Sequence, residues 1–315
     1  SASGFTSAAG FTAIRTGAGD DTVVVDAGMR SVVTGAGDDV VTLGAALGAL
    51  SVDLGAGSDT LQGDQDETGL LGGVETPLGT RFTVTSLGAD GAAGRAQLRF
   101  GAGDAFTAGQ DISFTGAESL AGLGGEDDPD SLIFDLNVAT GSTATWYIPD
   151  VYAGAILLGG ARLSYEGIRL AGMESSGGRT NPLVRLSYAG DGAGIAQYES
   201  AVSVDLTQGL VSGLAGWTGA VDALIGTEFD DSLMGDATTR LVQGGAGDDR
   251  IGTRLIAGAT LDGGAGDDMV FYDRAAATTV LTDTAITQGG SVVSLSGIES
   301  AFLAADADTA GATID

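Results

Sequence analysis

The sequence contains no Cys, no His and no Lys, and only 4 Pro among its 315 residues. Without Cys, neither disulfides nor thiolate chemistry is available. The absence of His removes the commonest general base and the usual ligand of transition metals. No apolar run reaches the roughly 18 residues of a membrane-spanning helix, so we expect no transmembrane segment. No basic stretch followed by an apolar core begins the sequence, and we expect it to start inside a longer protein.

Positive charge is also scarce. The net charge is −29, from 42 acidic residues and 13 basic ones, and all of the basic residues are Arg. Such a chain repels nucleic acid and anionic lipid and attracts divalent cations, so we expect no nucleic-acid partner. Asp accounts for 33 of the acids and is concentrated in turns rich in Gly, of which there are 55. This bias favours binding of hard cations.

The sequence has a nine-residue repeat of apolar positions. In the first stretch these positions are separated by 9, 9, 11 and 9 residues, and in the second by 9, 9, 10 and 9: they are Val23, Val32, Val41, Val52 and Leu61, then Leu233, Val242, Ile251, Leu261 and Val270. A short fixed period predicts stacked coils of one structural unit. Each position lies in a short β-rich segment that ends in a turn, and helical spacing is absent. We therefore predict an all-β fold, a right-handed parallel β-roll or β-solenoid with a narrow core.

A loop rich in Gly and Asp occurs in every second segment between these apolar positions. The loops read T-G-A-G-D-D at 16–21 and 34–39, L-G-A-G-S-D at 54–59, and G-G-A-G-D-D at 244–249 and 263–268. The glycines permit positive φ and inward carbonyls, and the sixth residue adds a carboxylate. Donors that are all oxygen suit Ca²⁺ better than Mg²⁺. Because successive loop Asp residues are about two nonapeptides apart, we expect the loops to stack on neighbouring coils and to share about four or more calcium ions. Asp39 lies between two such loops and is expected to matter more for calcium than Asp59.

These loops resemble the G-G-x-G-x-D-x-U-x nonapeptides of the RTX (repeats-in-toxin) family, whose members fold as calcium-bound parallel β-rolls. The segment Leu224–Gly235 also resembles the turn that often precedes such repeats. The resemblance implies type I secretion and a calcium site at Gly17, Gly19, Asp20, Asp21, Gly35, Gly37, Asp38, Asp39, Gly55, Gly57, Asp59, Asp230, Asp231, Gly245, Gly247, Asp248, Asp249, Gly264, Gly266, Asp267 and Asp268. The first glycine is replaced by Thr16, Thr34 and Leu54, and residues 227–229 replace the glycines before Asp231. We expect weaker binding at those positions.

The repeat suggests four parts: an N-terminal β-roll (1–71), an irregular β-rich middle (72–215), a C-terminal β-roll (216–275), and terminal strands with a tail (276–315). The middle is either a wider continuation of the solenoid or a β-sandwich that interrupts it. A phrase of the form G-x-E-S or G-x-E-T recurs at residues 73, 116, 172 and 297. Asp104 is interpreted as a turn residue without metal. We interpret Trp146, Tyr147 and Trp217 as packing residues and not as a sugar platform.

The motifs of the common secreted enzymes are absent: H-E-x-x-H requires His, and no G-x-S-x-G occurs. We therefore expect a non-enzymatic, calcium-binding structural module of a secreted bacterial cell-surface protein (surface layer, adhesin or filament). It would fold on calcium outside the cell, with copies of itself or other surface components as partners. One alternative is the RTX module of a secreted polysaccharide-modifying enzyme, which could use Arg162, Glu166, Arg169, Glu174 or Arg185. Another is the receptor-binding repeat region of a toxin.

Overall fold

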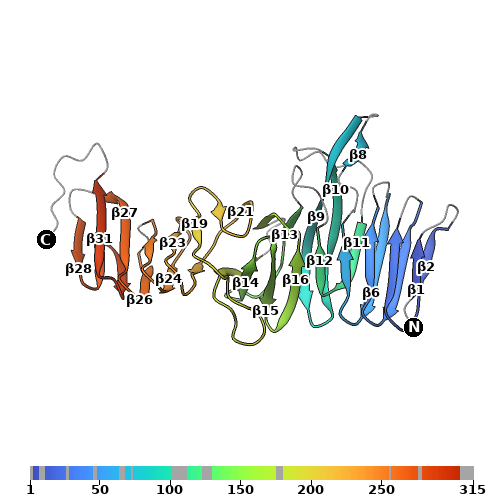
Figure 1. Cartoon of the computed structure of the whole chain (residues 1–315), viewed down its shortest axis with the longest axis horizontal. Helices are drawn as coiled ribbons and strands as arrows, with labels where there is room; N and C mark the ends of the chain where they lie inside the picture. Colours follow the sequence, from blue (N-terminus) through green and yellow to red (C-terminus); the bar gives the residue numbers. More distant parts are fainter. Residues whose placement is uncertain are drawn as a thin grey trace. The chain divides into compact units, whose positions relative to one another are not determined.

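The computed structural model describes residues 3–6, 11–25, 28–44, 48–63, 68–71, 74–100, 112–122, 130–174, 180–254, 257–275 and 279–305 (Figure 1). Strands make up 59% of the chain, and the described residues contain no helix. The predicted all-β class is therefore confirmed. The chain forms two compact units: unit 1 comprises 1–142 and 152–182, and unit 2 comprises 143–151 and 183–315.

Unit 1 contains two sheets. The first has the strand order β1 (Ser3–Thr6), β3 (Asp21–Val25), β5 (Val40–Leu43), β7 (Thr60–Gln62), β12 (Ser119–Ala121), β16 (Ala161–Glu166) and β15 (Ala153–Leu158). The second has the order β2 (Ala13–Arg15), β4 (Ser31–Ala36), β6 (Leu50–Ala56), β11 (Ile112–Ala117), β10 (Gly91–Phe100), β9 (Val74–Gly88), β13 (Ser131–Phe134) and β17 (Leu170–Met173), and β8 (Thr68–Leu71) pairs with β9. Consecutive strands from β1 to β7 alternate between the two sheets.

The nine-residue apolar positions form columns in these sheets. In the first sheet Val23 pairs with Val41, Val41 with Leu61, and Leu61 with Leu120, all in parallel register. In the second, Ile14, Val32, Val52 and Phe114 form the equivalent column. From Val23 to Leu61 every predicted core residue is at most 1% exposed. The repeat of nine therefore places one apolar residue of each strand at the same buried position of its sheet.

The middle region of unit 1 extends these sheets. Strand β11 pairs in parallel with β6, and β12 pairs in parallel with β7. Between β7 and β11 in sequence, β9 and β10 form an antiparallel hairpin that pairs back onto β11. Within unit 1, these middle strands therefore belong to the same two sheets as the N-terminal strands. The hairpin is an insertion that the nine-residue repeat does not reveal.

Unit 2 also contains two sheets. The first has the order β14 (Thr143–Asp150), β18 (Leu183–Ser187), β22 (Ala223–Ile225), β24 (Leu241–Ala246), β26 (Thr260–Ala265), β30 (Ser291–Ser296), β29 (Ala285–Gln288) and β28 (Thr279–Thr282). The second has the order β20 (Leu210–Val211), β19 (Ser203–Asp205), β23 (Ser232–Met234), β25 (Arg250–Gly252), β27 (Met269–Ala275) and β31 (Ser300–Ala305); β21 (Gly216–Thr218) lies outside this series. From β22 to β27 consecutive strands again alternate between sheets.

The core of unit 2 is built in the same way. Leu224, Val242, Leu261 and Leu295 pair in one column, and the second column, Val204, Leu233, Ile251 and Val270, lies in the facing strand series. Away from the columns, Trp146 and Trp217 are 2% and 6% exposed and pack edge to face with ring centroids 4.9 Å apart. Their predicted packing role is confirmed. Tyr147 is half-buried.

Among the residues described, no helix is long and apolar enough to span a membrane.

Candidate metal centre

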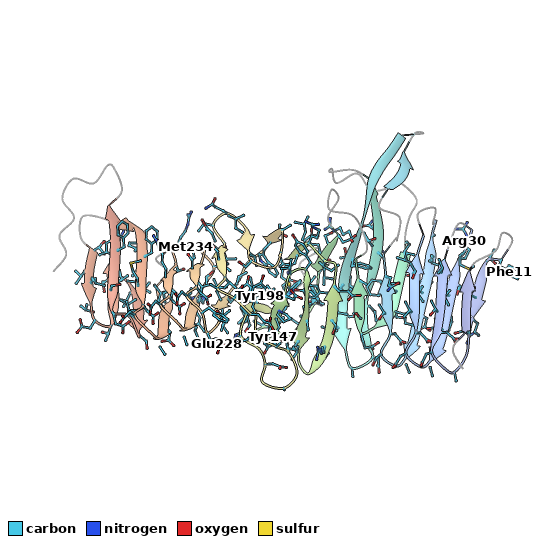
Figure 2. All side chains as sticks on the ribbon, in the orientation of Figure 1. Phe11, Arg30, Tyr147, Tyr198, Glu228 and Met234 are labelled. Carbon is cyan, nitrogen blue, oxygen red and sulfur yellow. The ribbon has the colours of Figure 1, made fainter. Side chains whose placement is uncertain are left out.

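The Gly-Asp loops all make the same kind of connection. In unit 1 they lead from β2 to β3, from β4 to β5 and from β6 to β7. In unit 2 they lead from β22 to β23, from β24 to β25 and from β26 to β27. Figure 2 shows Glu228, in the first of the unit 2 loops, and Met234, at the other end of β23, at opposite edges of that unit. The loops of each unit therefore stack along one edge, as their spacing predicts.

The sixth-position aspartates form a ladder in each unit. The amide of Asp21 donates to Oδ1 of Asp39, and the amide of Asp39 donates to Oδ1 of Asp59, each at 2.8 Å. In unit 2 the amide of Asp231 donates to Oδ1 of Asp249, and that of Asp249 to Oδ1 of Asp268, again at 2.8 Å. Each carboxylate thus bonds to the coil before its own. We call these series the inner ladders.

The fifth-position residues form a second ladder of opposite direction. The amide of Asp38 donates to Oδ1 of Asp20 at 3.0 Å, and that of Ser58 to Asp38 at 2.8 Å. In unit 2, Asp248 and Asp267 donate in the same way to Asp230 and Asp248. These outer aspartates are solvent-accessible, whereas the inner ones are buried. Neighbouring loops are therefore joined by two reciprocal carboxylate–amide bonds.

The second oxygen of the inner carboxylates is the chemically unusual feature. Oδ2 of Asp39, Asp59, Asp249 and Asp268 is buried and has no hydrogen-bond partner among the described residues. These four residues are at most 2% exposed. A buried carboxylate oxygen without a partner is costly, and native structures rarely leave one unsatisfied. A bound cation is one way to satisfy it.

The loop glycines bring main-chain oxygens close to these carboxylates. Gly244 is the first residue of its loop, and a Cβ added to it would overlap Oδ2 of Asp249 and lie 2.5 Å from the carbonyl oxygen of Gly263. A Cβ on Gly263 would similarly overlap Oδ2 of Asp268 and the carbonyl oxygen of Gly297. Two oxygens from successive coils therefore converge on a point that only glycine leaves open. We call this point the first-position cradle.

The N-terminal loops differ at this cradle, because their first residues have side chains. The hydroxyl of Thr16 donates to the carbonyl of Thr34, and the hydroxyl of Thr34 donates to the carbonyl of Leu54, both at 2.5 Å. Thr34 and Leu54 are fully buried. The departures from the repeat pattern thus place side-chain atoms where the unit 2 loops have none. This difference gives the predicted weakness of the N-terminal loops a physical basis.

Asp231 differs for another reason. Its Oδ1 accepts a hydrogen bond from the amide of Val202 at 2.8 Å, and its Oδ2 accepts one from the amide of Thr227 at 2.6 Å. The hydroxyl of Thr227 lies 3.0 Å from both oxygens. The residue that replaces a loop glycine therefore satisfies the carboxylate. Both oxygens of Asp231 therefore have hydrogen-bond partners, although a Cβ on Gly226 would overlap its Oδ2 and the carbonyl oxygen of Gly244, as at the other cradles.

Burial in the inner ladders raises the pKa of several of their aspartates. Burial is the largest cause, and it raises the pKa of Asp249 from 3.8 to about 7, although the amide of Asp231 opposes the shift. Burial likewise raises the pKa of Asp59 from 3.8 to about 6, with the charges of Glu118 and Asp39 adding to the effect. The pKa of Asp268 is also raised, first by burial and then by Glu299. Without a cation, these three carboxylates take up a proton at higher pH than an ordinary Asp does.

The structure adds two residues that the sequence did not identify as site residues. The amide of Asp59 donates to Oε2 of Glu118 at 3.0 Å, and the amide of Asp268 donates to Oε2 of Glu299 at 2.8 Å. Each glutamate is the next member of an inner ladder, and both belong to the recurring G-x-E-S phrase. Asp59 therefore also lies between two loops, and the expectation that it matters less than Asp39 loses its premise. The recurring G-x-E-S phrase could have identified both glutamates. Because the phrase lies outside the Gly-Asp repeats, the sequence did not connect it with the ladders.

In the described part of the chain, no three acidic side chains converge in a way that could hold a metal. A cation between two loops would instead combine two carboxylates with main-chain carbonyls. Oxygen donors, convergent geometry and buried unpartnered Oδ2 atoms fit Ca²⁺. Asp104 lies outside the described residues.

Of the residues considered for catalysis, Glu174 forms an ion pair with Arg81. Arg169 donates to the hydroxyl of Tyr152 at 3.1 Å and lies over its ring. Both residues therefore have side-chain partners within unit 1. No family model and no curated protein matches the sequence.

Proposed function

We propose that the chain is a calcium-binding structural module of a secreted bacterial cell-surface protein, in which calcium between the stacked loops stabilises a right-handed β-roll. The observation that supports this most strongly is the set of buried, unpartnered Oδ2 atoms at Asp39, Asp59, Asp249 and Asp268. A net charge of −29 and the absence of disulfides support the same proposal. In this account cations neutralise the stacked carboxylates that otherwise repel one another.

Folding is coupled to calcium in this proposal. A ligand that binds only the folded state stabilises it by about 2.7 kcal/mol per site at a hundredfold excess over Kd. Several such sites supply as much free energy as the roughly 5–15 kcal/mol stability of a typical domain. Extracellular calcium modules work near 10⁻⁴–10⁻³ M, far above the free calcium of the cytosol. The chain would therefore fold after export.

Titration of the purified chain with calcium tests this proposal. Far-UV circular dichroism should show β structure gained as calcium rises through the submillimolar to millimolar range, and EGTA should reverse it. Magnesium at the same concentration is the control for ionic strength and charge, and we expect it to be much less effective. A chain that binds no calcium, or whose spectrum and melting temperature ignore EGTA, contradicts the proposal.

The structural role needs its own experiment. Electron microscopy of calcium-loaded material should show ordered sheets or filaments that disperse in EGTA. Hydrolase or lyase activity on polysaccharides would instead favour the secreted-enzyme alternative. Calcium-dependent binding to cells as a monomer would favour the toxin-type receptor module.

A further inference from the structure

We infer that Glu118 and Glu299 each complete an additional cation site, formed between the last Gly-Asp loop of a ladder and the short G-x-E loop stacked on it. The inference rests on the proposed calcium function. It extends the metal centre to two residues outside the Gly-Asp loops, and it gives the recurring G-x-E-S phrase a chemical role.

The hydrogen bonding shows that each glutamate takes the place of an aspartate. In the inner ladders, each carboxylate after the first accepts a hydrogen bond from the amide of the sixth-position Asp in the coil before it. Glu118 accepts this bond from Asp59, and Glu299 accepts it from Asp268. The main chain continues the pattern, because the carbonyl of Asp268 accepts from the amides of Glu299 and Ser300, both at 3.0 Å. The carbonyl of Asp59 receives the equivalent pair from residues 118 and 119.

The loop lengths explain why the acid is Glu. A Gly-Asp loop has five residue steps from its first Gly to its ladder carboxylate, whereas the G-x-E loop has two. Gly297 stacks on both of the first two glycines of the preceding loop: its carbonyl oxygen lies at the Gly263 cradle, and a Cβ on Gly297 would lie 2.8 Å from the amide nitrogen of Gly264. The extra methylene of Glu299 then lets its carboxylate reach the ladder.

A buried, unpartnered atom points into the site. Oδ2 of Asp268 is buried without a hydrogen-bond partner, and Asp268 is 0% exposed. The Gly263 cradle places this atom beside the carbonyl oxygen of Gly297, and the Glu299 side chain is bonded to the amide of Asp268. These are the donor types found between Gly-Asp loops: one carboxylate from each coil and a convergent carbonyl. Asp59 is also 0% exposed with Oδ2 unpartnered, and its amide bonds to Glu118 in the same way. Leu54 stands at the first position of this loop, so the Glu118 site shares the two carboxylates but not the glycine cradle.

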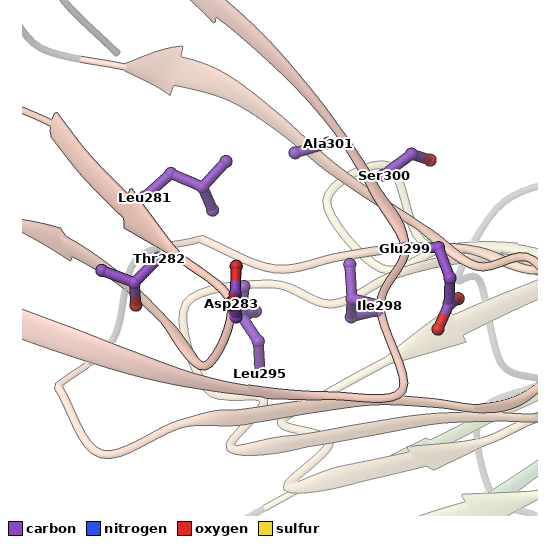
Figure 3. A pocket seen from close by; sticks show the side chains of 8 residues that line it. All are labelled: Leu281, Thr282, Asp283, Leu295, Ile298, Glu299, Ser300 and Ala301. Atoms are coloured by element: carbon purple, nitrogen blue, oxygen red, sulfur yellow. The ribbon is translucent and has the colours of Figure 1, made fainter. Parts of the chain in front are cut away.

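Asp283 is another acidic residue near Glu299, but it lies away from the site we infer. Asp283 and Glu299 both line a pocket of about 190 Å³ in unit 2. Figure 3 shows Ile298 between them, with Glu299 on the side away from Asp283. Oε2 of Glu299 is bonded to the amide of Asp268, so the site we infer lies between Glu299 and that loop.

Counting bound calcium in matched variants tests the inference. Glu299→Gln and Glu118→Gln keep an oxygen acceptor for the ladder amide but remove the charge, and Glu174→Gln is the control. Glu174 belongs to the same phrase but is ion-paired with Arg81. Equilibrium dialysis against ⁴⁵Ca should show that each of the first two variants loses one ion per chain or binds one ion at least roughly tenfold more weakly. The control should match the parent protein.

Three results separate the possible failures. If Glu118→Gln and Glu299→Gln keep the parent stoichiometry and affinity while Asp249→Asn loses calcium, the inference is wrong and the proposed function stands. If the parent protein binds no calcium, the proposed function itself fails. Glu299→Ala removes the acceptor as well as the charge, so weaker binding in Glu299→Ala together with parent-like Glu299→Gln would show that the glutamate serves only as a hydrogen-bond acceptor. Dialysis at calcium concentrations where each variant has the parent's β spectrum keeps folding defects out of the comparison.

Discussion

The amide of Asp249 donates a 2.8 Å hydrogen bond to Oδ1 of Asp268, and the other oxygen of the Asp268 carboxylate has no partner although the side chain is fully buried. One oxygen of the carboxylate therefore joins two coils, and the other is the oxygen that we propose binds a cation. Substitutions and changes of pH should separate the two roles.

Replacing Asp249 by Asn should weaken calcium binding with little loss of coil register. The amide keeps an oxygen that can accept from Asp231, but the charge beside the Gly244 cradle is lost. We expect the calcium midpoint of folding to rise roughly tenfold or more. Asp236→Asn is the matched control, because Asp236 accepts hydrogen bonds from Thr238 in a turn away from the inner ladder. Equal midpoints for the two variants would contradict a special role for Asp249.

Asp39→Asn and Asp59→Asn should have similar effects on calcium binding. Asp39 lies between the loops of Asp21 and Asp59, and Asp59 lies between the loops of Asp39 and Glu118. Isothermal titration of both variants compares them directly. A clearly smaller effect at Asp59 would show that Glu118 does not act as a ladder member.

Gly35→Ala should destabilise the calcium-loaded protein by about 2–3 kcal/mol. Gly35 has a φ of +119°, and an added Cβ would overlap the carbonyl oxygen of Gly17 in the coil before it. Gly17→Ala is the control at the same loop position, because nothing lies within 4 Å of a Cβ there. Denaturant unfolding at saturating calcium measures both variants. An equal loss of stability in the two variants would mean that the close approach of Gly35 to the Gly17 carbonyl does not affect the free energy of unfolding.

Exchanging the first loop residue should change calcium affinity in opposite directions in the two units. Gly244→Thr would force side-chain atoms onto Oδ2 of Asp249 and the carbonyl of Gly263, and should weaken binding at least roughly tenfold. Thr34→Gly removes the hydroxyl that bonds to the carbonyl of Leu54 and should free that oxygen for calcium. Calcium titration of the two variants and the parent checks both signs. Tighter binding in Gly244→Thr would contradict the cradle as a ligand position.

Without calcium, acid should stabilise the fold. The pKa of Asp249 is about 7 in the folded chain against 3.8, and that of Asp59 is about 6. A raised pKa means that the folded state binds more protons than the unfolded state between these values. The contribution is fully present below about pH 3.8 and is lost as the pH rises through 6 to 7.

Thermal melting in EGTA at pH 4.5 and pH 7.5 measures this effect. We expect the lower melting temperature at pH 7.5, and added calcium should recover stability there by replacing the protons. Asp249→Asn removes one titrating group and should flatten the pH dependence. A calcium-free melting temperature that rises from pH 4.5 to pH 7.5 would contradict the ladder electrostatics.

The repeats carried most of the predictable information. Val23, Val41 and Leu61 were predicted as core residues from spacing alone, and the structure buries all three in one parallel column. This succeeds because a coil of constant length returns each apolar side chain to the same place. The Gly-Asp loops stack for the same reason, because a constant coil length brings each loop next to the previous one.

The closure of the ladders could not be read from the spacing. Glu118 stacks on Asp59 across 59 residues, because the chain between them includes the β9–β10 hairpin. Hairpin insertions change the sequence separation but leave the stacking order unchanged. The hydrogen bonds from Thr227 to the Asp231 carboxylate could not be predicted for a different reason. Thr227 donates them through its hydroxyl and amide at a position where the repeat pattern has glycine.

The most direct test of the calcium account combines ion counting with melting on the same samples. Purified chain is depleted of metal exhaustively, divided, and measured by equilibrium dialysis and circular dichroism with and without millimolar calcium at pH 7.5. The account predicts about four or more ions per chain and a large gain in β signal and melting temperature on adding calcium. A metal-free chain that keeps the full β signal and the same melting temperature, and takes up no calcium, would contradict it.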